Sequence, residues 1–219
     1  MYFNEIVVTS ENNNLLKNIQ SLSENKSLNS IKPEERIRKK IELYNFCKEA
    51  NLSDCNYTPE SYKVLSKTYN ILNIEYAYNA YSNPDEYFKY ATFNLITGER
   101  ITYNKIFKNP PKILNDYNSK YTSEIKSYLK KLNTNDEEEL DEYNLYKEHL
   151  ETRNSFKLED LNNLEIIYDP IKGKVTQLKF HYNGQGGYYR QYLQKGFIDF
   201  NIEELRPYLT DEFKKQLEI

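Results

Sequence analysis

The side chains that most often carry out chemistry are few in this chain, and their spacing matches no known catalytic motif. The two histidines, His149 and His181, lie on different predicted elements, and "KEHLE" lacks the second histidine of a His-Glu-x-x-His zinc motif. No Gly-x-Ser-x-Gly nucleophile elbow occurs. The acidic run "DEEELDE" stands at a predicted helix start, where such runs are typical of a solvated face. We therefore predict a protein that is not an enzyme and that needs neither a metal ion nor a cofactor.

The two cysteines, Cys47 and Cys55, lie close together in "FCKEANLSDCNY". A zinc site would require further Cys or His residues nearby. A disulfide between them would join a helix end to the following loop and would suit an oxidising compartment. Two independent thiols explain the spacing equally well, so Cys47–Cys55 is a candidate disulfide and both interpretations stay open.

The glycine-rich loop "NGQGGYY" is the candidate binding surface of the sequence. Its backbone N–H groups could hold an anion, but it lacks the Lys-Ser/Thr of a P-loop and the Rossmann spacing. Tyrosine and arginine supply most binding hot spots in protein interfaces. We therefore predict that a partner contacts Tyr188, Tyr189, Arg190 and Tyr192.

Composition and charge limit the partners and the compartment. The net charge of -3 gives no electrostatic support for binding nucleic acid or an anionic membrane, which both require clustered positive charge. No run of about 18 apolar residues occurs, so no transmembrane helix is predicted. The N-terminal "MYFNEIVVTSENNN" has no signal-peptide pattern. The chain is then either an extracytoplasmic protein (periplasmic, lipid-anchored or secreted) with a start Met added, or a cytoplasmic protein that begins at a native Met1.

The periodicity of apolar residues predicts an α+β domain, in which an antiparallel sheet packs against two to three amphipathic helices. We expect a first strand at residues 2–9 and a helix from Pro33. A strand meander should span about residues 62–107, with one buried face and one wetter face. Two helices, from Pro110 and from about residue 136, should precede a hairpin, a last strand and short capped helices. The helix from Pro33 should bury its apolar positions, which are Ile37, Ile41, Tyr44 and Cys47.

Two stretches resemble one family, the domain of unknown function 3298 (DUF3298). The first is "FNLITGERITYNKIF", an aromatic-led strand, a Thr-Gly turn and a short apolar segment that ends in Ile106 and Phe107. The second is "FIDFNIEELRPYL", a closing strand followed by Glu-Leu-x-Pro-Tyr-Leu. The positions that fit the two patterns are Phe93, Leu95, Thr97, Gly98, Ile101, Ile106 and Phe107, and Glu204, Leu205, Pro207, Tyr208 and Leu209.

The resemblance covers about residues 60–210, and "SYKVLSKTYNILNIEYAYNAY" also looks like the strand pair of the domain that usually stands before this family. It implies a companion-like part at residues 1–60 and, at 61–219, a domain like the C-terminal part of RsiV-type anti-sigma factors, which also occurs beside PdaC-type deacetylase domains. The family's hallmark positions make the fold, so no catalytic residue transfers with them. The segment "NGQGGYYRQYLQKG" departs from the family pattern before the last strand, which puts the partner in doubt.

Two functions follow as expectations. The first is a non-catalytic binding or sensing domain of the bacterial cell envelope, in contact with a lysozyme-like protein or a cell-wall glycan. The alternative is a cytoplasmic immunity or inhibitor protein that neutralises a bacterial toxin. A glycan-active enzyme, suggested by the deacetylase neighbours of the family, is a third and weaker alternative, because the sequence offers no metal triad.

Overall fold

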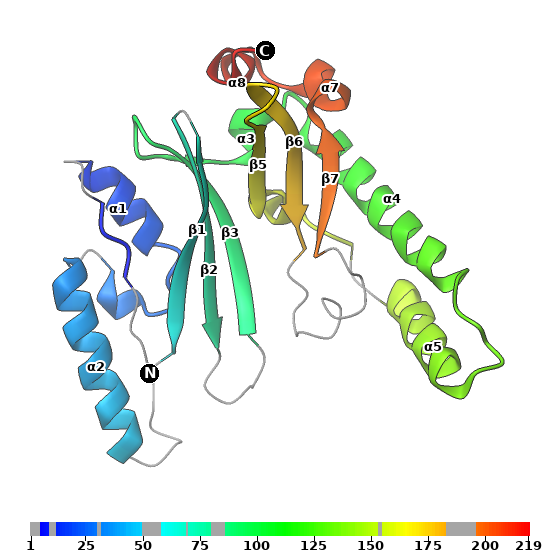
Figure 1. Ribbon diagram of the computed structural model, residues 1–219, viewed down its shortest axis with the longest axis horizontal. Coiled ribbons are helices and arrows are strands. Elements are labelled where there is room, and N and C mark those ends of the chain that lie inside the picture. Colours follow the sequence, from blue (N-terminus) through cyan, green and yellow to red (C-terminus); the bar gives the residue numbers. More distant parts are fainter. Residues whose placement is uncertain are drawn as a thin grey trace.

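The computed structural model describes residues 5–8, 12–29, 32–49, 58–68, 70–79, 86–152, 155–182 and 196–219. The strands in these ranges form two antiparallel sheets that lie side by side, with helices on the outer side of each (Figure 1). The predicted α+β class is therefore confirmed. The first four strands of the chain form a four-stranded sheet, and the last three form a separate three-stranded sheet.

The four-stranded sheet is the predicted meander. Its strands β1 (Glu60–Thr68), β2 (Ile71–Asn79), β3 (Glu86–Asn94) and β4 (Arg100–Ile101) pair in chain order. One face carries apolar side chains of β2 and β3 and packs against helix α1 (Asn13–Gln20). The buried side chains of this first core are Leu15, Ile19, Leu22, Leu72, Ile74, Tyr76, Ala91 and Phe93.

The opposite face of this sheet was predicted to be wetter, and that prediction is wrong. Asn73 and Thr92 on this face are 2% and 0% exposed. The outer edge of strand β5 (Leu164–Asp169) covers them. Alternation of polar and apolar residues marks two faces, but it does not show whether a second sheet covers the polar one.

Asn73 pairs with the backbone of β5 as a neighbouring strand would. Its Nδ2 donates to the Ile166 carbonyl at 2.9 Å, and its Oδ1 accepts from the Ile166 N–H at 3.1 Å. The Thr92 hydroxyl lies 2.8 Å from the Leu164 carbonyl and 2.8 Å from Asn73 Oδ1. Because β5 is an edge strand, these side chains satisfy backbone groups that would otherwise be left without partners.

The three-stranded sheet contains β5, β6 (Lys174–His181) and β7 (Phe197–Asn201), in that order. Helix α4 (Pro110–Leu129) covers one face of it, and helix α5 (Glu137–Thr152) packs beside α4 (Figure 1). Four positions of α4 are buried and form one inward stripe. These positions are Ile113, Tyr117, Tyr121 and Ile125.

The two stretches that carry the family resemblance lie against each other. Phe107 forms a β-bridge with Leu209, and the Lys108 N–H donates to the Tyr208 carbonyl at 2.8 Å. Asn201 and Thr210 accept from backbone N–H groups and cap the closing helices, as predicted.

Residues 5–8 belong to no strand, so the predicted first strand is not confirmed there. The remaining short elements are η1 (Lys26–Leu28), α3 (Tyr103–Ile106), η3 (Leu158–Asn162), α7 (Ile202–Leu205), η4 (Arg206–Tyr208) and α8 (Asp211–Leu217).

Helix α2 (Pro33–Glu49) forms where it was predicted, but its inward face differs from the prediction. Ile41 is 41% exposed, whereas Arg36 and Lys40 are fully buried. Ile37 and Tyr44 are only half-buried, and Cys47 alone of the predicted positions is buried. The sequence pattern failed here because two cations found buried carboxylates as partners, which apolar periodicity does not report.

The buried cations and carboxylates form one network between α2, the segment 5–8 and β1. Arg36 lies 2.7 Å from Glu5 and 2.7 Å from Glu60, and Lys40 lies 2.9 Å from each. Arg36 also donates to the Leu28 carbonyl at 2.5 Å. Two positive and two negative side chains therefore balance in a site from which water is excluded, and they hold α2 to the sheet.

The Thr-Gly turn of the β3–β4 hairpin has a second role besides turning the chain. Gly98 has φ +73°. A Cβ on Gly98 would lie 2.5 Å from the backbone nitrogen of Leu15 at the start of α1. Asn12 and Asn18 donate side-chain hydrogen bonds to carbonyls of the same turn. Glycine is therefore required by the backbone conformation and by the close approach of α1.

Replacing Gly98 with alanine is expected to lower the free energy of unfolding by more than the about 1–2 kcal/mol that a left-handed backbone alone costs. Gly173 is the matched control, since it has φ +64° but its nearest neighbour, the Tyr168 hydroxyl, is 3.9 Å from an added Cβ. Urea denaturation of both variants measures the difference. Equal losses would show that α1 does not press on the turn.

Candidate functional site: a pocket around Arg100

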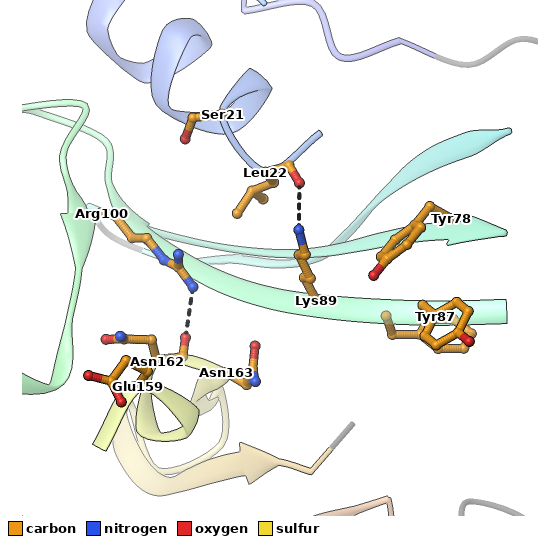
Figure 2. A pocket seen from close by; sticks show the side chains of 10 residues that line it. Ser21, Leu22, Tyr78, Tyr87, Lys89, Arg100, Glu159, Asn162 and Asn163 are labelled. Carbon is orange, nitrogen blue, oxygen red and sulfur yellow. Dashed lines mark hydrogen bonds between the residues drawn. The ribbon is translucent and has the colours of Figure 1, made fainter. Parts of the chain in front are cut away.

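A pocket of about 410 Å³ opens where α1, β3, β4 and η3 meet, and we call it the Arg100 pocket. This volume lies within the range of small-molecule sites. Figure 2 shows its wall and the side chains that reach into it. The lining residues are Ser21, Leu22, Tyr78, Tyr87, Phe88, Lys89, Arg100, Glu159, Asn162 and Asn163.

Arg100 begins strand β4, directly after the Thr-Gly turn, and pairs with Phe93 in the ladder. Its Nη2 donates to the carbonyls of Tyr90 and Asn162, at 3.2 and 3.1 Å (Figure 2 draws the second). Its Nε is buried and has no hydrogen-bond acceptor within the described ranges. No carboxylate in those ranges lies within ion-pair distance of the guanidinium. Two backbone carbonyls thus fix the group while part of its donor capacity remains unused.

Burial lowers the pKa of Arg100 from its usual value. Arginine nevertheless stays protonated in proteins because its usual pKa is above 12. A charged group taken partly out of water without a counter-ion costs free energy, which a bound anion would recover. The electrostatics of the pocket therefore favour a negatively charged group beside Arg100.

Lys89, the second cation of the pocket, already has partners. Its Nζ donates to the Leu22 carbonyl at 3.2 Å and forms an ion pair with Glu24 (Figure 2 draws the first). It also lies over the rings of Tyr76 and Tyr78, 5.7 and 5.4 Å from their centroids. Lys89 therefore joins the end of α1 to the sheet, and Arg100 is the cation that lacks a counter-charge.

Neutral polar groups also line the pocket. Asn162 Oδ1 accepts from the Tyr103 N–H at 3.1 Å, which holds its amide in place. Ser21 donates to the Asn18 carbonyl at 2.6 Å, so its oxygen is left to accept. Asn163 presents its side-chain amide at the wall, and its carbonyl accepts from the His181 N–H at 2.8 Å. Such groups can bind a ligand with hydroxyls or amides around its charge.

Tyr78 and Tyr87 form the aromatic end of the pocket. They are cross-strand partners on β2 and β3, and their rings stack with centroids 5.3 Å apart and planes at 21°. Burial and the charge of Glu24 raise the pKa of the Tyr78 hydroxyl. The strands thus supply the aromatic end and both cations of the pocket, and η3 supplies further polar groups of its wall.

The binding residues predicted from the sequence, Tyr188, Tyr189, Arg190 and Tyr192, lie outside the described residues. Their role as a contact surface stays a prediction. Of the candidate disulfide, Cys55 also lies outside the described residues, while Cys47 is a buried residue of α2.

Both histidines contact residues of other elements. His181 is buried and stacks on Tyr90 with ring centroids 3.6 Å apart, and its Nε2 lies 3.0 Å from Glu165. Burial lowers the pKa of His181, and the hydrogen bond and charge of Glu165 act against that effect. His149 is half-buried, and its Nε2 lies 2.9 Å from the Tyr121 hydroxyl. Both side chains serve the packing between elements.

Sequence reasoning missed Arg100 and Lys89, although Arg100 stands inside the family-like stretch "FNLITGERITYNKIF". The sequence signal was the position of Arg100, a charged residue two places after the glycine of the Thr-Gly turn. The charge balance of the pocket was not visible, because Glu24 and η3 come from distant parts of the sequence.

Within the described residues, no three His, Cys, Asp or Glu side chains are placed to hold a metal ion. The helices in the same ranges include none with the length and apolar character required to span a bilayer.

Comparison with known proteins defines the class of fold. No protein-family model matches the chain, and no curated protein matches it. Among solved structures, the chain is similar to the crystal structure of a DUF3298 family member from Bacteroides fragilis, with a TM-score of 0.56 and 13% sequence identity. The match covers 94% of this chain and 80% of that chain. The chain therefore has the fold of a DUF3298 family member, whereas the RsiV-type and PdaC-type relationships stay predictions.

Proposed function

We propose that this chain is a non-catalytic binding or sensing domain of the bacterial cell envelope, which contacts a protein or a cell-wall glycan through the Arg100 pocket. The observation that carries the proposal is a partly buried guanidinium that has no counter-ion within the described ranges and opens into a polar pocket. Arginine is well suited to bind carboxylates and other planar anions. The similarity to the Bacteroides fragilis DUF3298 structure supports the bacterial context of the proposal.

The predicted contact loop fits the same proposal. The chain enters residues 183–195 directly after His181 and Tyr182, and the His181 N–H donates to Asn163 in the pocket wall. We propose that the same partner contacts Tyr188 and Tyr189. Introducing charges at Tyr188 and Tyr189 should weaken partner capture and leave the fold unchanged.

Capture from envelope material tests the function. The immobilised protein is incubated with a cell-envelope fraction and with lysozyme-type enzymes, and retained material is identified by mass spectrometry and sugar analysis. We expect R100Q to retain at most about a tenth of the wild-type amount, because a charged hydrogen bond is worth about 1.5–3 kcal/mol. R38Q is the matched control, since Arg38 is an exposed arginine of α2, 63% exposed. Equal capture by the wild type and R100Q would contradict the proposal.

A second candidate function, a cytoplasmic immunity or inhibitor protein, is favoured by one feature of α2. Phe46 is 57% exposed and Ile41 is 41% exposed, and Phe46 lies beside a shallow hollow lined also by Leu28 and Leu43. Exposed apolar side chains that gather on one helix are typical of contacts with a protein. If this function holds, F46D should abolish capture of a toxin encoded beside the gene, whereas R100Q should leave it unchanged.

A further inference from the structure

Unlike Arg36, Lys40 and Lys89, the partly buried Arg100 has no carboxylate partner within the described ranges. Arg36 and Lys40 each contact two carboxylates. Lys89 contacts Glu24. Since buried charges in proteins are generally paired, the exception in an open pocket indicates that the counter-charge comes from a ligand.

The charge balance of the pocket selects the kind of anion. Lys89 is neutralised by Glu24, and Glu159 adds a negative charge at the wall. Arg100 is thus the one of these cations without a carboxylate at ion-pair distance in the described ranges, which matches a single anionic group on the ligand. A phosphate carries up to two negative charges at neutral pH and would meet more repulsion from Glu159. A carboxylate is therefore the better fit.

The groups around Arg100 indicate what carries the carboxylate. Ligand pockets are in general lined mainly by hydrophobic side chains, with a few polar groups that fix the orientation of the ligand. Here Asn162, Asn163 and Ser21 line the pocket with amides and a hydroxyl, and Tyr78 and Tyr87 close one end. Amides and hydroxyls suit the hydroxyls of a sugar, and aromatic rings suit its C–H face. A volume of about 410 Å³ accommodates a monosaccharide with a substituent.

From these observations, and resting on the proposed binding function, we infer that the Arg100 pocket binds a carboxylate-bearing hexose of a glycan. The ligand carboxylate accepts from the guanidinium of Arg100, and the sugar hydroxyls bond to the amides of Asn162 and Asn163. A uronic acid and a hexose with a lactyl ether share this chemistry and differ in the source of the glycan.

Titration with matched sugars, followed by NMR chemical-shift changes, tests this ligand class. The pairs are methyl glucuronide against methyl glucoside, and N-acetylmuramic acid against N-acetylglucosamine. We expect the carboxylated member of at least one pair to bind at least tenfold more tightly than its neutral partner. The pair that shows the preference identifies the source of the glycan. Equal binding of the two sugars within both pairs would overturn the inference. So would the absence of chemical-shift changes with either acid. Both results come from the wild-type protein alone.

Variants and a peptide probe complete the test. R100Q should remove the preference for the acid, R100K should restore part of it, and R38Q should leave it unchanged. Loss of the preference in R38Q, or its survival in a folded R100Q, would contradict the role of Arg100.

Tighter binding of an acetylated acidic peptide than of both sugar acids would assign the pocket to a protein partner. In that case the inferred ligand class is wrong, but the proposed binding function stands. Equal capture of envelope material by the wild type and R100Q would instead contradict the proposed binding function.

Discussion

Replacing Glu60 with glutamine is expected to lower the free energy of unfolding by about 3–5 kcal/mol, since removing one partner of a buried ion pair leaves an uncompensated charge. The Glu60 side chain is fully buried, and its carboxylate lies 2.7 Å from Arg36 and 2.9 Å from Lys40. Its second oxygen accepts from the Tyr76 hydroxyl at 2.8 Å and from Ser23. The substitution would leave two buried cations with Glu5 as their remaining carboxylate. Urea denaturation at neutral pH measures the loss.

The matched control is E42Q on the outer face of α2. Glu42 is 58% exposed and forms an i,i+4 pair with Arg38 at 2.8 Å. Exposed helix pairs contribute about 0.3–0.5 kcal/mol, so this variant should unfold almost as the wild type does. Equal losses in E60Q and E42Q would show that the buried network does not stabilise the protein.

The same network predicts a dependence on pH. Burial alone would raise the pKa of Glu60, but attraction to Lys40 and hydrogen bonds from Ser23, Lys40 and Tyr76 outweigh burial and place its pKa below the usual 4.5. On acidification the unfolded chain then takes up the proton first. The stabilisation is complete above pH 4.5 and is lost as the pH falls through the folded-state pKa. Denaturation curves between neutral pH and about pH 3 should fall more steeply for the wild type than for E60Q, and parallel curves would contradict this account.

Replacing Asn73 with leucine is expected to cost about 3–5 kcal/mol and to loosen the contact between the two sheets. The Ile166 N–H and carbonyl, which Asn73 satisfies at 3.1 and 2.9 Å, would be left buried without partners. Each such group costs about 1–3 kcal/mol. Urea denaturation gives the total, and hydrogen exchange at Ile166 reports the opened edge of β5.

Two controls separate this effect from general damage. T92V removes the hydroxyl that lies 2.8 Å from the Leu164 carbonyl, and it should cost about 1–3 kcal/mol because a single buried acceptor loses its partner. N115L changes an exposed asparagine of α4 and should stay within about 0.5 kcal/mol of the wild type. Thr92 and Asn73 are hydrogen-bonded to each other. The N73L/T92V double variant should therefore lose less free energy of unfolding than the sum of the losses in the two single variants. If the Ile166 N–H stays protected from hydrogen exchange in N73L, its hydrogen bond to Asn73 is not what protects it, and the proposed pairing is refuted.

The sequence predicted those helices, turns and caps that depend only on residues close to one another in the chain. The helix from Pro33, the helix from Pro110, the meander and the caps at Asn201 and Thr210 all formed where predicted. Each depends on periodicity, a rigid proline or a hydroxyl or amide close to the N–H that it caps. The Thr-Gly turn belongs to the same group, because the positive φ of Gly98 is a local requirement.

The candidate site could not be predicted in the same way, because long-range contacts set its charge. A sequence shows that Arg100, Lys89, Arg36 and Lys40 are cations but not which of them find carboxylates. Lys89 is paired with Glu24, 65 residues away in the chain, and the Arg100 guanidinium is fixed by Asn162, 62 residues away.

By itself, the sequence determined the α+β class, the position of most elements and the resemblance of the stretch from Phe93 to Phe107 to a DUF3298 domain. The tertiary structure decided which faces are buried. It turned the polar face of β2 toward a second sheet and the charged face of α2 toward Glu5 and Glu60. The physical reason is that backbone geometry is set by neighbouring residues, whereas burial and pairing of polar groups depend on partners that only the folded chain brings together.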